Sequence, residues 1–392
     1  MAENTDDKEK QPQLMSRRSF LQKSALMGAA FLAASSVIPQ ETEAKDRSRA
    51  NKSGHMNISG RRTLGSQSQC RTDGIGTGFG CMGMNYNRSV SPSRKECIKV
   101  IREAVERGVT LFDTAIIYGP LINEELVGEA LAPYKGQVAV TTKFGHEVIN
   151  GKATGRQNSR PEIIRRYCEE SLRRLRVDCL EMFYQHRLDR NVSIEEVAGT
   201  IGDLIKEGKV KRWGVCEVSA DTIRRAHAVT PLTAVQSEYH LMFRDVETNG
   251  VLDACRELGI GFVPYSPMNR GFLGGAINEY TRFDPNNDNR QTLPRFSPEN
   301  IRLNTRIVNE LQEFGRKRGM TSAQVALAWL LAKAHFIVPI PGTTKLAHLE
   351  ENLRAADMPL SAADVRELEA AVDRFPVVGD RYPAEQQCQV QS

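Results

Sequence analysis

Segment 110–119 carries an acid and a phenol close together, Asp113 and Tyr118. It begins as a short apolar run, the pattern of a strand buried on both faces, and Gly119-Pro120 interrupt the chain before a new helix. An acid at a strand end and a phenol just beyond it can share one pocket, where the phenol can transfer a proton. A buried Asp capping a helix, beside a packed Tyr, would give the same pattern. Later segments decide between these interpretations.

More polar side chains end apolar segments further along the chain. They are Lys143 after the predicted strand 137–142, His186 after 179–184, Gln236 after 233–235 and Ser266 after 260–263. Other strands are predicted at 76–82, 110–113, 210–215 and 336–340. Helical periodicity predicts helices at 93–107, 123–131 (with an Asn cap), 161–175, 193–206, 221–228, 246–258, 299–318, 321–333 and after Lys345.

This alternation predicts parallel strands joined by helical crossovers. The predicted strands from 110–113 onward, together with 76–82, provide the eight units of a (β/α)8 TIM barrel, an α/β fold. Polar residues at the carboxyl ends of barrel strands face the active site. We therefore expect Asp113, Lys143, His186, Gln236 and Ser266 to converge.

The glycines at 76–83 look at first like a dinucleotide-binding loop. However, the G-x-G-x-x-G spacing fails, no helix-start signal follows at once, and no acidic residue stands at the expected place in a following strand. We therefore expect no Rossmann domain. Glycine here is predicted to let the backbone pass close to a ligand at a barrel mouth.

Composition narrows the classes of function. The 392 residues carry a formal charge of +5, with Lys and Arg scattered among Asp and Glu, which predicts no nucleic-acid surface. The eight Cys include no C-x-x-C pair, and no Cys/His cluster has zinc spacing. Most lie in apolar segments, where Cys is a small core residue. We expect neither a metal site nor a disulfide framework.

The amino-terminal segment has the features of an export signal. Ser16-Arg17-Arg18-Ser19-Phe20-Leu21-Gln22-Lys23 precedes an apolar stretch, 24–38, which is short for a membrane span of roughly 20 residues. It resembles a bacterial twin-arginine (Tat) signal. We expect a signal peptide at 1–44, a linker at 45–60, a barrel at 61–375 and a tail at 376–392. The resemblance implies the Tat export machinery as a partner, a periplasmic location and no stable membrane span.

Short motifs follow one another along the predicted barrel. They are Phe112-Asp113-Thr114-Ala115, Tyr118-Gly119, Thr142-Lys143-Phe144-Gly145, Tyr184-Gln185-His186-Arg187-Leu188-Asp189, Gln236-Ser237-Glu238-Tyr239, Tyr265-Ser266-Pro267, Ile340-Pro341-Gly342-Thr343 and Leu349-Glu350-Glu351-Asn352. Each is weak alone, but all of them in order are specific. Over residues 61–375 the chain resembles the aldo-keto reductases. The resemblance implies NADP(H)-dependent reduction of a small-molecule carbonyl to an alcohol, or the reverse.

The resemblance also implies a catalytic tetrad, which the chemistry of the residues supports. Hydride transfer to a carbonyl builds an alkoxide that needs a proton donor, and Tyr118 is the candidate. Its phenol has an ordinary pKa of roughly 10, which the Lys143 ammonium would lower. Asp113 would hold Lys143, and His186 would orient the substrate carbonyl.

Further positions match the family's cofactor contacts. Gln236 and Tyr239 match positions at the nicotinamide, and Cys216 and Glu217 stand where many relatives carry Ser-Asn. Ser266, Met268 and Arg270 match the loop over the pyrophosphate. At the adenosine phosphate the matching positions are Gly342, Thr343, Lys345 and His348, and at the adenine they are Glu351 and Asn352. The family's Tyr that stacks on the nicotinamide stands on a strand, whereas Tyr239 lies beyond Gln236. Lys345 can neutralise a 2'-phosphate, which favours NADP over NAD.

Two alternatives stay open. An exported barrel could hold NADP(H) as a redox sensor or regulatory subunit without turnover, because fold does not fix function. The same residues could also serve an oxidation. The loops 84–90, 145–158 and 270–298 are the candidates for setting the substrate.

Overall fold

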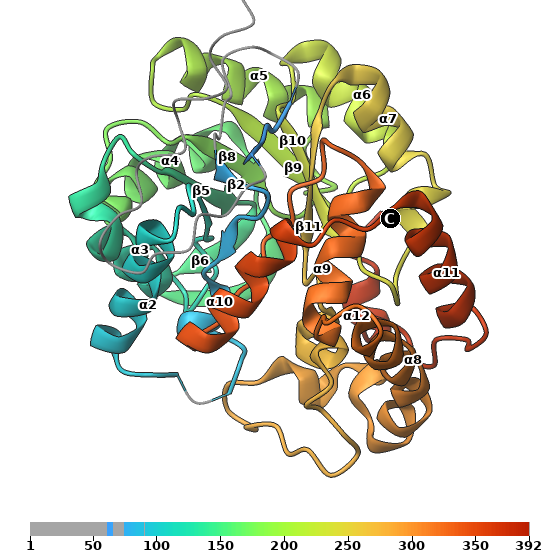
Figure 1. Ribbon diagram of the computed structural model, residues 1–392. Coiled ribbons are helices and arrows are strands. Elements are labelled where there is room, and N and C mark those ends of the chain that lie inside the picture. Colours follow the sequence, from blue (N-terminus) through green and yellow to red (C-terminus); the bar gives the residue numbers. More distant parts are fainter. Residues whose placement is uncertain (1–60, 66–73, 90, 392) are drawn as a thin grey trace, which may run out of the picture. The chain divides into compact units, whose positions relative to one another are not determined.

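Seven parallel strands form the central sheet of the computed structural model, which describes residues 61–65, 74–89 and 91–391 (Figure 1). In sheet order the strands are β3 (Phe79–Gly80), β4 (Leu111–Asp113), β5 (Ala139–Phe144), β8 (Met182–Gln185), β9 (Trp213–Cys216), β10 (Ala234–Glu238) and β11 (Gly261–Tyr265). Each is parallel to its neighbours. The strands predicted from the sequence are therefore present, with ends that differ by a few residues, except for 336–340.

The segment predicted as strand 336–340 closes the gap between β11 and β3. On one side, Val338 N donates to Phe262 O at 2.9 Å and Ile340 N to Pro264 O at 3.2 Å. On the other, Gly78 N donates to Pro339 O at 2.9 Å. Because proline has no N–H, Pro339 and Pro341 cannot donate back to β3. The segment therefore completes a (β/α)8 barrel without forming a regular strand.

Helices surround the strands (Figure 1). They are α2 (Arg94–Glu106), α3 (Ile122–Leu131), α4 (Pro161–Leu175), α5 (Ile194–Lys206), α6 (Ala220–Val229), α7 (Val251–Leu258), α8 (Pro298–Arg316), α9 (Ser322–Lys333), α10 (Leu346–Arg354), α11 (Ala362–Val372) and α12 (Ala384–Gln387). A Ser or Thr side chain accepts from a first-turn amide at six of them, for example Ser93 at α2 and Thr321 at α9. These caps satisfy amides that the helix itself leaves free.

The predicted Asn cap of α3 is wrong. The helix begins at Ile122, after Leu121 in a left-handed conformation with φ of 72°, and Asn123 lies inside the first turn. The Asn123 side chain donates instead to Cys81 O at 3.0 Å. It therefore joins α3 to the loop after β3, a long-range contact that the local sequence could not indicate.

Two antiparallel pairs of strands lie outside the barrel sheet. β1 (Arg61–Arg62) pairs antiparallel with β2 (Gly74–Ile75). β6 (His146–Ile149) pairs antiparallel with β7 (Lys152–Gln157), so most of the predicted loop 145–158 is a hairpin. Among the described residues, no helix is both long and apolar enough to cross a membrane.

The barrel interior follows from the alternation of side chains along each strand. Residues two apart on a strand share a face. Leu111 packs in an inner apolar cluster with Met182, Ala234 and Val263, so Asp113 points to the same side. The same alternation directs Thr141 and Lys143 of β5 inward.

Candidate active site

Lys143 and Asp113 form a buried ion pair inside the carboxyl end of the barrel. The ammonium also donates to Thr114 O at 2.7 Å. The second carboxylate oxygen, Oδ2, accepts from Thr141 Oγ1 at 2.9 Å and from Gln236 Nε2 at 3.0 Å. Buried charges persist when they are paired and hydrogen-bonded, and both conditions are met here.

The Tyr118 hydroxyl accepts from Lys143 Nζ at 3.3 Å. Its ring packs with Ala115, Ile117 and Val148 and stacks against Tyr86, with the ring centroids 5.9 Å apart. Burial raises the pKa of Tyr118 to about 12, although the Lys143 charge acts to lower it. The predicted lowering effect of the ammonium is present, but the net shift is upward, because desolvation of the phenolate outweighs that attraction.

His186 presents its ring edge-on to Tyr118, with 5.8 Å between the ring centroids. Its backbone N–H donates to Phe144 O at 2.8 Å. Burial, with the neighbouring His146 and Arg187, lowers the pKa of His186 well below its ordinary value. The imidazole is therefore neutral at pH 7. Nδ1 is buried and has no hydrogen-bond partner among the described residues. His186 lies beside Tyr118 and is not itself among the residues that line the cavity described next.

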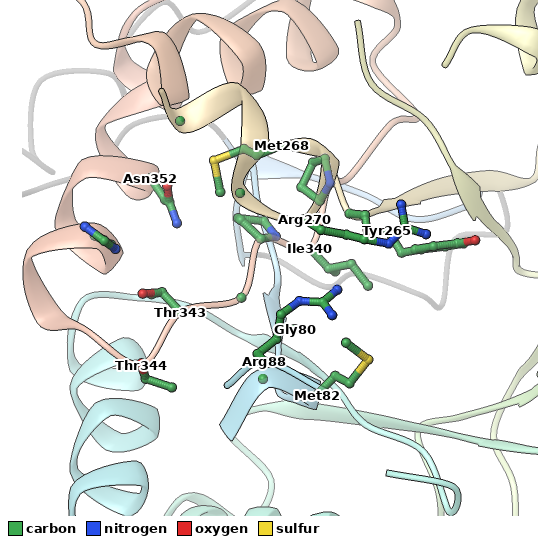
Figure 2. Close-up of a pocket in the computed structure, with 18 of the residues that line it drawn as sticks. Gly80, Met82, Arg88, Tyr265, Met268, Arg270, Ile340, Thr343, Thr344 and Asn352 are labelled. Atoms are coloured by element: carbon green, nitrogen blue, oxygen red, sulfur yellow. The ribbon is translucent and has the colours of Figure 1, made fainter. Parts of the chain in front are cut away.

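A cavity of about 400 Å³ opens beside these residues (Figure 2). Asp113 and Tyr118 line it, as do the β11 end with the loop after it and the segment 340–345 with the start of α10. Figure 2 shows Thr343, Thr344 and Asn352 across the space from Met268 and Arg270. The volume of the cavity lies within the range of roughly 300–1,000 Å³ that small-molecule sites occupy.

At two glycines, the backbone segments that border the cavity come into close contact. A Cβ at Gly342 would lie 2.4 Å from Gly80 O, and a Cβ at Gly80 would lie 2.8 Å from Ile340 O. The predicted reason for the glycines near β3 was close passage to a ligand. In the structure, Gly80 lies against residues 340–342, so its lack of a side chain first serves contact between two segments of the barrel.

The sequence of this chain is similar to those of known proteins. A sequence model of the Aldo/keto reductase family matches residues 77–373. The probable aldo-keto reductase 1 of Glycine max is 44% identical over 307 residues, which are 78% of this chain and 87% of the relative. The chain belongs to the aldo/keto reductase family.

Solved structures agree with the family assignment. The glycerol dehydrogenase of Gluconobacter oxydans has a TM-score of 0.73 at 25% identity and covers 83% of this chain and 98% of its own. An aldo/keto reductase of Klebsiella pneumoniae, solved in complex with NADP and acetate, has a TM-score of 0.61 at 22% identity and covers 82% of this chain and 99% of its own. The second likeness concerns the fold alone.

Most of the cofactor positions predicted for this aldo/keto reductase line the cavity. They are Gln236, Ser266, Met268, Arg270, Gly342, Thr343, Lys345, His348, Glu351 and Asn352. Lys345 is exposed immediately before α10, and Asn352 is buried within that helix. Residues far apart in the sequence thus line one cavity.

Tyr239 is placed elsewhere, which corrects the prediction. Its ring is fully buried against Trp329 and Phe262, and its hydroxyl donates to Glu247 at 2.5 Å. Tyr239 directly follows β10 and packs toward α9 rather than the cavity. The aromatic ring on a strand end that does line the cavity is Tyr265 of β11. The motif around Tyr265 was visible in the sequence, but the strand assignment was needed to select it.

Cys216 and Glu217 do not line the cavity either. Cys216 is buried in β9, and burial raises the pKa of its thiol to about 12. Glu217 follows in a left-handed conformation with φ of 56°. Its carboxylate accepts from Glu238 N at 2.8 Å and pairs with Arg381 at 2.6 Å. The Glu217 carboxylate is thus held by contacts within the protein.

Arg88 is a cavity residue that was not singled out from the sequence, although it lies in the loop 84–90 that is predicted to help set the substrate. It stands in the loop after β3, and Figure 2 shows its guanidinium directed into the space between Gly80 and Arg270. It donates to Asn289 Oδ1 at 2.8 Å but forms no ion pair with any described residue. Burial, with the charges of Arg270 and Arg290, lowers its pKa. An anion in the cavity would relieve this repulsion.

Proposed function

We propose that the protein reduces an aldehyde or ketone to an alcohol, or catalyses the reverse oxidation, with NADP(H) as hydride carrier. The observation that carries this proposal is the Asp113–Lys143–Tyr118 arrangement at a cavity large enough for a small substrate beside a nicotinamide. A proton donor and a buried cation in contact suit a reaction that creates an alkoxide.

Each member of the tetrad has one proposed task. Tyr118 gives its hydroxyl proton to the developing alkoxide oxygen, and Lys143 stabilises the phenolate left behind. Asp113 neutralises Lys143 before and after that transfer. The neutral His186 ring, adjacent to Tyr118, donates a hydrogen bond to the substrate carbonyl and orients it.

The residues of the cavity fit a phosphorylated dinucleotide. Gln236 uses its Nε2 on Asp113, which leaves Oε1 to accept from the nicotinamide amide. Tyr265 presents an aromatic ring, and Arg88, which forms no ion pair within the described part of the chain, places a positive charge near the expected diphosphate. The amino end of α10 and Lys345 suit the adenosine phosphate, which favours NADP(H) over NAD(H). When bound, the nucleotide supplies the hydride.

Cofactor oxidation tests this function directly. Purified protein is mixed with NADPH and a panel of aldehydes and ketones, and nicotinamide absorbance is followed with wild type and Tyr118→Phe. We expect carbonyl-dependent oxidation in wild type and its loss in the variant, with nucleotide binding retained. Nucleotide binding with no oxidation by any carbonyl would favour the sensor or regulatory role instead.

We also propose export through the Tat pathway to the periplasm, on the motif at Ser16–Lys23, which lies outside the described residues. A folded protein would then carry its nucleotide with it and recycle it in place between a reducing and an oxidising substrate. Replacing Arg17 and Arg18 by Lys should keep a reporter fusion in the cytoplasm. Complete loss of nucleotide from the exported protein on simple dilution would contradict the captive cofactor.

A further inference from the structure

The C-terminal segment, residues 376–391, returns to the carboxyl ends of three barrel strands. Arg381 pairs with Glu217 just after β9, at 2.6 Å. Tyr382 shares a hydrogen bond of 2.8 Å with Tyr265, the last residue of β11. Gln391 N donates to Glu217 O at 3.0 Å. A segment that the sequence predicted as a simple tail is thus part of the structure around the site.

These contacts belong to a buried cluster of charges. Glu238, the last residue of β10, is fully buried and accepts from both guanidinium nitrogens of Arg270, at 2.8 and 3.0 Å. Arg381 lies 3.9 Å from the same carboxylate. Arg381 and Glu217 are 3% and 1% exposed. Breaking a buried ion pair by removing one partner is costly, so loss of the Arg381 guanidinium should destabilise the cluster around Glu217.

Tyr265 connects this cluster to the cavity. Its side chain lines the cavity, while its hydroxyl meets Tyr382 and lies 3.5 Å from Glu238 Oε2. The Tyr382 ring is itself held between charged neighbours, with Arg270 5.3 Å and Arg381 5.2 Å from its centroid. The orientation of Tyr265 therefore depends on a residue from the far end of the chain.

We propose that Arg381 and Tyr382 are positioning residues for the nicotinamide end of the cofactor site. Arg381 holds the C-terminal segment on Glu217, and Tyr382 fixes the Tyr265 ring in the orientation that stacks on the nicotinamide. A ring held in place loses less rotational freedom when the ligand arrives, so binding is tighter. This inference rests on the proposed function for its ligand, a nicotinamide dinucleotide.

Linkage adds a second consequence. If the docked segment favours nucleotide binding, then bound nucleotide must favour the docked segment by the same free energy. Amide hydrogens of residues 376–391 should therefore exchange more slowly when NADPH is bound. A segment that only covers the surface, with no energetic connection to the site, would exchange at the same rate in both states.

The first test is Tyr382→Phe, which keeps the ring and removes the hydroxyl bonded to Tyr265. NADPH binding is measured by fluorescence titration of the full chain, which requires no turnover. We expect the Kd to rise about 3- to 10-fold, the effect of losing one hydrogen bond, with little change in the Tm of the nucleotide-free protein. Gln389→Ala, in the same segment, is the matched control, and its Kd should equal that of wild type.

The second test is Arg381→Met, alone and combined with Glu217→Gln. We expect the single variant to lower the Tm and weaken NADPH binding, and the double variant to recover Tm because it removes both members of the Arg381–Glu217 ion pair. Wild-type affinity in Tyr382→Phe, together with unchanged exchange of 376–391 on adding NADPH, would overturn the proposal. A protein that binds NADPH but reduces no carbonyl would contradict the proposed function alone, because these readouts measure binding.

Discussion

Tyr118 combines two opposing influences at the scale of single residues. Burial among apolar side chains favours the neutral phenol, while Lys143 favours the phenolate, and burial prevails. A phenol that stays protonated is a suitable proton donor in the reducing direction. The contact with Lys143 then limits the cost of transferring the proton.

Replacing Tyr118 by Phe should remove the proton donor and leave the rest of the site in place. General acid catalysis contributes about 10²- to 10⁴-fold, so we expect kcat for reduction to fall by that factor. The Kd for NADPH should stay within about twofold of wild type, since Tyr118 lies at the substrate end. A variant with full activity would show that another group donates the proton.

The pH dependence should follow the raised pKa of Tyr118. Below a pKa of about 12 the phenol is protonated, so reduction should vary little between about pH 6 and 9. Oxidation needs the phenolate, whose fraction increases as pH rises toward the pKa, so its rate should increase across the same range. Reduction that declines steeply with a midpoint near pH 7 would contradict this assignment.

Removing the Lys143 charge should raise the Tyr118 pKa further. In Lys143→Met the rise of the oxidation rate should therefore move to higher pH, measured as a pH–rate profile. Asp113 would then be buried without its cation, so the Tm should also fall. An unchanged profile in folded protein would show that Lys143 does not act on Tyr118.

At the scale of elements, the junction of β3 with segment 340–342 depends on two glycines. Gly342→Ala would place a Cβ 2.4 Å from Gly80 O, and backbone cannot yield as a flexible side chain can. We expect a loss of about 1–3 kcal/mol in the free energy of unfolding, measured by denaturant titration, and weaker NADPH binding.

Gly199→Ala is the matched control for that substitution. Gly199 lies within α5, and a Cβ there would meet nothing within 4 Å. Because alanine favours a helix over glycine, this variant should gain about 0.5–1 kcal/mol. The two Gly-to-Ala substitutions should thus change the free energy of unfolding in opposite directions. Equal destabilisation by both would contradict the contact argument.

At the scale of the whole molecule, nucleotide binding should stabilise the fold and show which nucleotide is preferred. A ligand at 100 times its Kd adds about 2.7 kcal/mol. At equal concentration NADPH should raise the Tm more than NADH does, because Lys345 can neutralise the 2'-phosphate. Lys345→Met should reduce that difference. As a control, Lys317→Met replaces an exposed lysine that forms an ion pair with Glu313, and it should leave the difference unchanged.

The sequence by itself determined the barrel and the polar residues at its mouth. Strand alternation and crossover helices are local patterns, and the carboxyl ends of parallel strands meet at one edge, so the order of the strands alone was enough to bring Asp113, Lys143 and Gln236 together. The motifs in order then indicated the family. Local periodicity carries this information because it reflects burial along each element.

Only the tertiary structure decided which side chains complete the site. Tyr239 and Tyr265 each stand at the end of a strand, and the packing of Trp329 against Tyr239 directs one inward to the core while the other faces the cavity. The direction in which the Tyr118 pKa is shifted could be determined only once its burial was known as well as its charged neighbour. The contacts of Arg381 and Tyr382 join residues more than a hundred positions apart. Such contacts depend on how elements pack, and no local pattern in the chain encodes them.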